Sequence, residues 1–200
     1  MVRGSKFDPD AFVDAALLLL SEGGPTAVTM AAIARRSGAP TGSIYHRFPS
    51  RSAVVAAAWL RALTAFAGEI EAMMAAAPNI DSASLVAWSR RHPREARALF
   101  LNQPADLFDT APPQDVSAAI RAQEARIESA FQAWLGATPE SDPEAFARLR
   151  FAVIDGPIAL IQPYLQSGGP IPDFVDAVAR SLGPLVAVEP RMTLPPRAAE

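Results

Sequence analysis

The spacing of apolar residues constrains the fold of this chain more than any other feature of its sequence. Apolar side chains recur at every third or fourth position, and runs of β-branched residues with a period of two are missing. Such spacing places side chains on one face of an α-helix. The clearest stripe lies between residues 51 and 76 and consists of Trp59, Leu63, Phe66, Ile70 and Met73. The sequence therefore predicts an all-α fold.

Capping residues, glycines and prolines set the helix boundaries. Asp8 followed by Pro9 is typical of a helix start, and Gly-Gly-Pro at 23–25 is expected to end that first helix. We predict a loop at 102–114 and a fraying tail at 189–200. The remaining helices are predicted at about 29–36, 41–48, 51–76, 80–91, 93–102, 116–134, 143–166 and 172–188.

The helix over 143–166 differs from the others because apolar residues cover two of its sides. A helix of this kind must be covered on both sides. Pro157 lies inside the pattern and is expected to kink the helix. In the following helix, Gly183 and Pro184 form a potential break.

The composition argues against several classes of protein. Without cysteine, the chain has no disulfide, no thiolate metal site and no cysteine nucleophile. No apolar run approaches the roughly 18 residues of a membrane-spanning helix, and the N-terminus lacks the apolar core of a signal peptide. We therefore expect a cytoplasmic protein that does not contact a membrane.

Catalysis finds little support in the sequence. His46 and His92 are far apart in the chain, and no Gly-x-Ser-x-Gly motif supplies a nucleophile. Glu69 and Glu71 are two positions apart on a predicted helix, so they face different ways. Metal-ligand spacings are also missing. We expect no enzyme activity, no metal and no cofactor.

Charge is distributed unevenly along the chain. The net charge is −3, yet the segment from Gly23 to Gly68 holds five arginines and no acidic residue. Residues 69 to 200 hold 11 basic and 17 acidic side chains. This asymmetry is expected when only one end of a protein meets an anionic partner.

The predicted helices at 29–36 and 41–48 have the dimensions of a helix-turn-helix. Ala34 is small where two helices would cross, Gly38 stands where the turn needs a positive φ, and Ile44 would project into the angle between the helices. The residues left facing outward are small or carry hydrogen-bond donors, as a DNA major groove requires. The alternative is a tight helical corner with a purely structural role.

The block TMAAIARRSGAPTGSIYHRFPSR, from Thr29 to Arg51, resembles the DNA-binding region of the TetR/AcrR family of bacterial transcriptional regulators. The resemblance implies a three-helix N-terminal reader, a connecting fourth helix and a variable helical domain that binds a ligand and dimerises through its last two long helices. Carried over by position, the residues implied to contact phosphates are Thr29, Tyr45, Arg47 and Arg51. Those implied to lie near bases are Thr41, Gly42, Ser43 and His46.

Two positions depart from the family pattern. Ala31 stands where a polar residue is usual and offers no hydrogen bond to a base. Pro40 precedes the second helix where a serine cap is common, which makes Thr41 itself a candidate cap. These departures affect the implied base contacts and leave the implied phosphate contacts unchanged.

These features together predict two domains, a helix-turn-helix domain at 1–50 and a ligand-binding and dimerisation domain at 51–188. We expect a homodimer that pairs through 143–166 and 172–188, binds operator DNA as a repressor, and releases it when a small molecule binds. The alternative is a helical enzyme or ligand-binding protein that does not read DNA. Candidate ligand-binding residues are Phe66, Ile70, Met73, Trp88, Phe100, Phe131, Trp134, Phe151 and Asp155.

Overall fold

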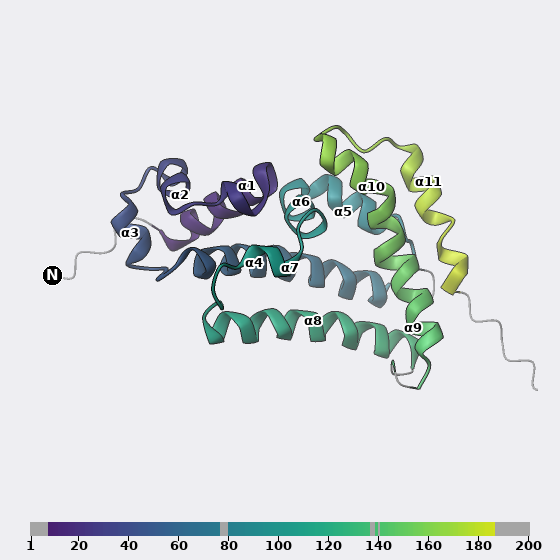
Figure 1. Cartoon of the computed structure of the whole chain (residues 1–200). Coiled ribbons are helices and arrows are strands. Elements are labelled where there is room, and N and C mark those ends of the chain that lie inside the picture. The colour runs from purple at the N-terminus through teal and green to yellow at the C-terminus, as the bar shows by residue number, and fades with distance from the viewer. Residues whose placement is uncertain (1–7, 77–79, 137–138, 140, 187–200) are drawn as a thin grey trace, which may run out of the picture.

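The computed structural model describes residues 8–76, 80–136, 139 and 141–186, and every regular element among them is a helix (Figure 1). The all-α prediction is confirmed. The N-terminal helices are α1 (Pro9–Ala27), α2 (Met30–Ser37) and α3 (Thr41–Tyr45). They are followed by α4 (Arg51–Ala75), α5 (Ser84–Arg91), α6 (Pro93–Phe100), α7 (Pro104–Leu107), α8 (Gln114–Leu135), α9 (Pro143–Arg150), the π-helical turn η1 (Phe151–Asp155), α10 (Gly156–Ser167), α11 (Phe174–Arg180) and the 3₁₀ turn η2 (Gly183–Val186).

Side-chain caps fix the starts of several helices. The Asp8 carboxylate accepts a hydrogen bond from the Asp10 amide at 3.0 Å, as the sequence predicts. Thr29 caps α2 through the Ala32 amide at 3.1 Å. At the other end of α1, Gly24 has φ 67° and ψ −168°. The helix axis is therefore interrupted at the predicted Gly-Gly-Pro, although one more helical turn follows it.

Other boundaries differ from the sequence predictions, among them the end of α3 at Tyr45 and the start of α5 at Ser84. The predicted loop at 102–114 contains the short helix α7, which starts at Pro104 because proline suits the first helical position. The predicted helix at 172–188 ends at Arg180 and continues as a 3₁₀ turn from Gly183. At Pro157 the helical path goes through a π-helical turn, where the Gly156 amide donates to the Phe151 carbonyl five residues back. The predicted tail at 189–200 lies outside the described residues.

The helices α4 and α8 run side by side along the length of the molecule (Figure 1). The N-terminal helices α1–α3 gather at one end, around the start of α4, while α9, α10 and α11 gather at the other. Helix α6 packs against both α1 and α4. The chain thus places α4 and α6 between its two ends.

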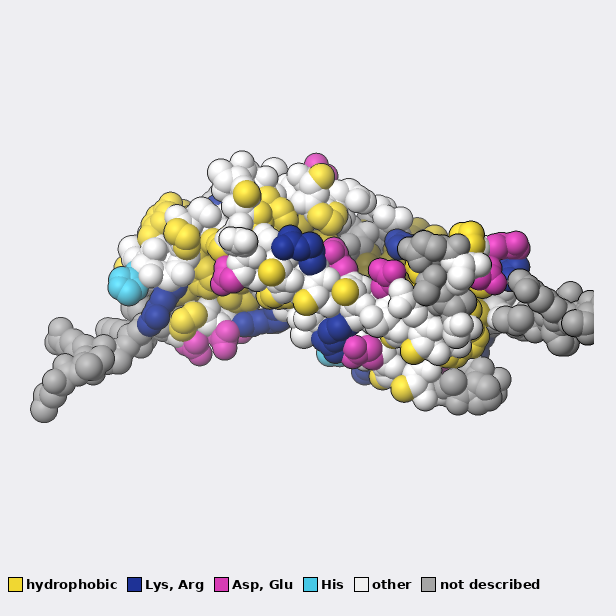
Figure 2. Space-filling model, turned by 90° about the horizontal axis from the view of Figure 1, so that it is seen from below, with side chains coloured by type: hydrophobic (Ala, Val, Ile, Leu, Met, Phe, Trp, Pro, Cys, Tyr) yellow, Lys and Arg dark blue, Asp and Glu magenta, His cyan; other side chains and the backbone are white. Residues whose placement is uncertain are grey.

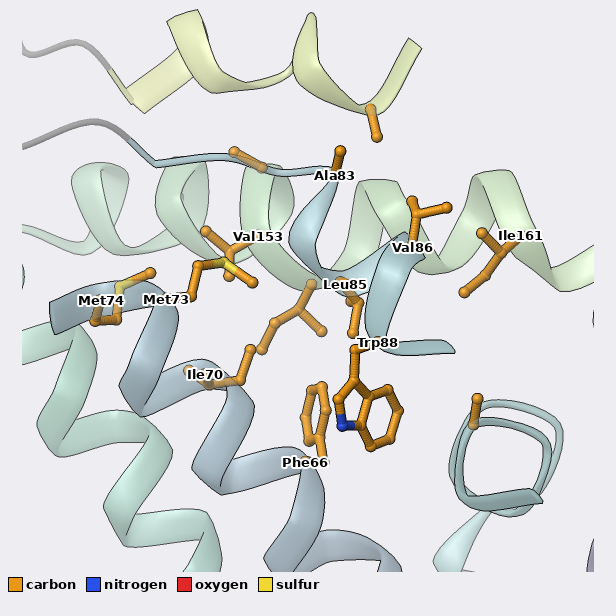
Figure 3. Close-up of a cluster of buried hydrophobic side chains, with 14 of the residues drawn as sticks. Phe66, Ile70, Met73, Met74, Ala83, Leu85, Val86, Trp88, Val153 and Ile161 are labelled. Carbon is orange, nitrogen blue, oxygen red and sulfur yellow. The ribbon is translucent and has the colours of Figure 1, made fainter. Parts of the chain in front are cut away.

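Two apolar cores lie along α4. One holds Phe12, Leu20, Ile33, Ile44 and Trp59, and the other surrounds Phe66, Ile70, Leu85, Trp88 and Ile161. Figure 3 shows side chains of the second core pointing toward one another from α4, α5, η1 and α10. Burying each such side chain contributes about 1.5–3 kcal/mol. The predicted apolar stripe of α4 is buried along its whole length because it serves both cores.

In the described part of the chain, one helix, α4, is long and apolar enough to cross a membrane by length and composition. Within the most apolar stretch of 18 residues of α4, 61% is buried inside the fold. Core packing accounts for this composition.

Candidate DNA-binding surface and effector cavity

Helices α2 and α3 pack against each other across a short turn at 38–40. Gly38 adopts the left-handed conformation, with φ 66° and ψ 21°, which an L-residue with a side chain rarely takes. The next amide, that of Ala39, donates to the Ala34 carbonyl at 3.1 Å. Ile33 and Ile44 have no exposed surface and pack in the angle between the helices. Gly38 and Ile44 have the roles predicted for them in the corner, and Ala34 is buried.

The outward face of this corner is polar and accessible. Tyr45 is 54% exposed although it is a large aromatic residue. Its exposed neighbours on the same surface are Thr29, Thr41, Gly42, His46 and Arg47, and Ser43 is half-buried. Helix α3 begins without a side-chain cap after Pro40, so Thr41 does not act as the cap considered above. The Thr41 hydroxyl is therefore available for hydrogen bonds to other partners.

Arg51 does not belong to this outward face. Its Nε donates to the Val28 carbonyl at 2.6 Å, and a second nitrogen donates to the Pro25 carbonyl. The third nitrogen donates to the Leu107 carbonyl at 3.1 Å and to Asp109 at 2.8 Å. The phosphate contact expected of Arg51 does not fit this arrangement, because the guanidinium is already bound inside the protein.

The arginine-rich segment is also less basic in space than in sequence. Arg61 pairs with Asp10 at 2.6 Å and with Asp14, and Arg36 pairs with Glu22 at 3.1 Å. Figure 2 shows Lys or Arg and Asp or Glu side chains intermixed over the face seen from below. Among the described residues, Arg35 and Arg47 are exposed and form no ion pair. These two carry the free positive charge of the described N-terminal end.

Most of the candidate ligand-binding residues on α4 and α5 are packing residues. The rings of Phe66 and Trp88, both labelled in Figure 3, have centroids 5.7 Å apart. The ring centroid of Phe100 lies 5.6 Å from that of Phe66. His92 stacks on Trp88 at 5.3 Å. Ile70 and Met73 belong to the same core. Of the other candidates, Phe151 is 48% exposed on the outer surface, and Asp155 pairs there with Arg150 at 3.1 Å.

A cavity of about 630 Å³ opens between α4, α8, α9 and η1. It includes two of the candidate residues, Phe66 and Phe131. Ile127, Phe146 and Ile154 also line it, although helical periodicity marks them only as apolar, because their place at a cavity depends on how α8 and α9 pack. The charged side chains at this cavity are Glu124, Glu128 and Arg150. Its size and mixed lining are typical of a small-molecule site.

A wider and more open groove of about 900 Å³ runs along the other side of α8 and includes Trp134. Alanines form much of its lining, and the Arg126 guanidinium binds the Glu71 carboxylate there, with Nε at 2.9 Å. This hydrogen-bonded pair lowers the pKa of Glu71 and raises that of Arg126. The groove offers few aromatic walls, so we regard the cavity between α8 and α9 as the stronger candidate.

Exposed apolar side chains occur on η1, α11 and η2: Phe151, Phe174, Val178 and Leu185. Arg90 of α5 fixes α11 by binding both carboxylate oxygens of Asp176, at 2.9 and 2.6 Å. These hydrogen bonds lower the pKa of Asp176. Within the described ranges, no group of three or more His, Cys, Asp or Glu side chains is placed to hold a metal ion.

Comparisons with known proteins agree with this geometry. Residues 12–58 match the model of the bacterial regulatory proteins of the tetR family. No curated protein is similar enough in sequence to count as a match. Among solved structures, a TetR family transcription regulator from Marinobacter aquaeolei VT8 is 14% identical, with a TM-score of 0.62 over 88% of this chain and 92% of that chain.

Two similar structures contain bound molecules. The transcriptional regulator FadR from Bacillus subtilis, in complex with stearoyl-CoA, is 15% identical, with a TM-score of 0.60 over 90% of this chain and 98% of that one. The multidrug binding protein EbrR, complexed with imidazole, is 22% identical, with a TM-score of 0.54 over 88% of this chain and 94% of that one. Residues 12–58 therefore form a domain of the tetR family of bacterial regulatory proteins, and most of the chain has the fold of a TetR family transcription regulator.

Proposed function

We propose that this protein is a repressor that binds operator DNA as a homodimer and releases it when a small molecule occupies the cavity between α8 and α9. The observation that carries the proposal is the corner formed by α2 and α3. There Ile44 is completely buried while Tyr45, His46 and Arg47 are exposed, so the end of α3 presents polar groups on a fixed support. A recognition helix in the major groove needs a buried side that fixes it to the protein and an exposed polar side that faces the DNA.

We assign base contacts to the first residues of α3 and to His46 just after the helix, and phosphate contacts to the residues around them. Thr41, Gly42, Ser43 and His46 would face base edges, where small groups allow a close approach. Thr29, Tyr45 and Arg47 would face phosphates. Arg51 has a different role in this proposal: it holds the start of α4 to the backbone carbonyls of Pro25 and Val28.

Dimerisation through the C-terminal helices is supported by their uncovered apolar side chains. Phe174 is 60% exposed, Val178 41% and Leu185 45%, which is unusual for residues of this type. A second copy of the same face, related by a twofold axis, would cover them. The two recognition helices would then be held at a fixed separation, as two half-sites on DNA require.

The remaining assignments follow from this arrangement. We propose a DNA-binding domain at 1–50, an effector and dimerisation domain at 51–188, and a cytoplasmic location, where the operator is found. The bound stearoyl-CoA and imidazole of the two similar structures support a small-molecule role for this fold. In this chain Phe66 of α4 borders the cavity, so a ligand there would contact the helix that leads directly to α3.

Operator binding can be tested by fluorescence anisotropy with a labelled duplex from the protein's own upstream region. We expect saturable binding at least about 1,000-fold tighter than to a scrambled duplex of equal length and composition. Arg47→Ala should weaken this binding. Arg121→Ala on α8 is its matched control and should not, because it removes an exposed arginine that lies away from α3. Equal affinity for the two duplexes would support instead a helical enzyme or ligand-binding protein that does not read DNA.

A further inference from the structure

The cavity between α8 and α9 has aromatic walls from three different helices. Phe66 comes from α4, Phe131 from α8 and Phe146 from α9. Phe66 is 6% exposed and Phe131 4%, so both rings are held by packing. Ile127 and Ile154 complete the apolar wall. These side chains favour a ligand with a sizeable apolar body over a small polar one.

The charged groups at the same cavity are mainly acidic. Glu124 and Glu128 lie four positions apart on α8, which places both carboxylates on one face of the helix. Like charges at this spacing repel each other. Glu128 accepts a hydrogen bond from the Gln132 amide at 3.1 Å, but neither glutamate forms an ion pair with a basic side chain of the described residues.

The basic group at the cavity is already compensated. Arg150 Nε lies 3.1 Å from a carboxylate oxygen of Asp155, which neutralises its charge. The two glutamates therefore determine the electrostatic character of the cavity lining. A cation seated between them would relieve their mutual repulsion, and aromatic faces attract cations as well. An anionic ligand would have to approach two uncompensated carboxylates.

We propose that the cavity binds a lipophilic organic cation, with its positive charge near Glu124 and Glu128 and its apolar body against Phe66, Phe131 and Phe146. The inference rests on the proposed function, since it assigns a ligand class to the effector cavity. It also separates this chain from a regulator of acyl-CoA, whose phosphate groups would meet the acidic lining.

Two ions of nearly equal shape and opposite charge provide the test. Tetraphenylphosphonium and tetraphenylborate have the same four-ring body, so apolar contacts contribute similarly to both. Titration calorimetry on the full-length protein should show tetraphenylphosphonium binding at least about tenfold more tightly than tetraphenylborate. The double variant Glu124→Gln/Glu128→Gln should lose this preference, because it keeps the shape of both side chains and removes their charge.

The control variant Asp106→Asn/Asp115→Asn removes two exposed carboxylates that do not belong to the cavity lining, and it should keep the wild-type preference. Phe131→Ala should weaken binding of both ions. Equal binding of the two ions, tighter binding of the borate, no binding of either, or an unchanged preference in the glutamate variant would each overturn the proposal. Operator binding is measured without these ions, so its failure would overturn the proposed function and leave the ligand result unaffected.

Discussion

Arg51 and Val28 are joined by a hydrogen bond of 2.6 Å, from Nε of the first residue of α4 to the carbonyl oxygen just before α2. The same guanidinium reaches Leu107 and Asp109 at the end of α7. One side chain thus ties the DNA-binding end to the loop that precedes α8. It acts on the backbone that positions the helix-turn-helix, and not on the surface that would face DNA.

Arg51→Ala should destabilise the protein by about 2–3 kcal/mol, because it removes the side-chain donor to the Val28 and Leu107 carbonyls and one of the two donors to the Pro25 carbonyl. Urea unfolding gives this value. Arg35→Ala, which removes an exposed arginine without an ion pair in the described structure, should change stability by less than about 0.5 kcal/mol. Equal effects of the two substitutions would contradict the structural role of Arg51.

Arg47→Ala should weaken operator binding without a large change in stability, since Arg47 is exposed at the end of α3. The slope of log affinity against log salt should fall by about 0.9, the amount expected for one lost phosphate contact. Sequence preference should stay the same, because phosphate contacts do not read bases. Anisotropy titrations at several salt concentrations measure both quantities. A wild-type slope in this variant would remove Arg47 from the contact surface.

The ion pair between Arg90 and Asp176 should make stability depend on pH in the acid range. Hydrogen bonds from Arg90 lower the pKa of Asp176 in the folded state. A lowered pKa stabilises the fold above the unfolded value of about 3.9, and this contribution disappears as the pH falls through the folded pKa. Asp176→Asn should therefore cost about 1–2 kcal/mol at pH 7 and progressively less as the pH falls below about 3.9. A cost that does not change with pH in urea unfolding would contradict this assignment.

Val178→Asp should convert the proposed dimer to a monomer, because it places a charge in the centre of the uncovered apolar face of α11. Size-exclusion chromatography with light scattering at micromolar concentration measures the change. Ala133→Asp on the exposed side of α8 is the control and should leave the dimer intact. A monomeric wild-type protein would show that this face serves another purpose.

The sequence predicts local structure well where one residue type determines the backbone. Gly38, Asp8 and the stripe on α4 act through short-range geometry or periodicity, and each has its expected role. Whether an arginine forms an ion pair is different, since this depends on acceptors far away in the chain. Arg51 meets Asp109, and Arg61 meets Asp10 and Asp14, so an arginine-rich segment is largely compensated in three dimensions.

The candidate cavity illustrates the same limit. Periodicity identifies Trp88 and Ile70 as apolar positions on helices, but it cannot distinguish a core residue from one at a cavity wall. The structure packs these two side chains in the core (Figure 3), whereas Phe146 and Ile154 reach the cavity. The difference arises from how α8 lies against α4 and α9, which no single helix encodes.

Arg97 of α6 joins both ends of the molecule. Its Nε donates to the Ser21 carbonyl of α1 at 2.6 Å, and its guanidinium also donates to the Leu165 carbonyl near the end of α10. A cation is favourable at both places, because carbonyls at the C-terminal end of a helix carry partial negative charge. Movement of α10 or α6 can therefore reach the DNA-binding end through α1 as well as through α4.

We expect Arg97→Met to weaken this coupling while it keeps most of the side-chain packing. Hydrogen exchange should become faster at the C-terminal part of α1, where Ser21 loses its partner, and stay unchanged within α2. The factor by which tetraphenylphosphonium changes operator affinity should fall toward one, since this factor measures the coupling between the two sites. Arg94→Met makes the same substitution at an exposed position of α6 and should leave both measurements at their wild-type values. If Arg97→Met keeps wild-type exchange in α1 and the wild-type coupling factor, α4 alone carries the signal.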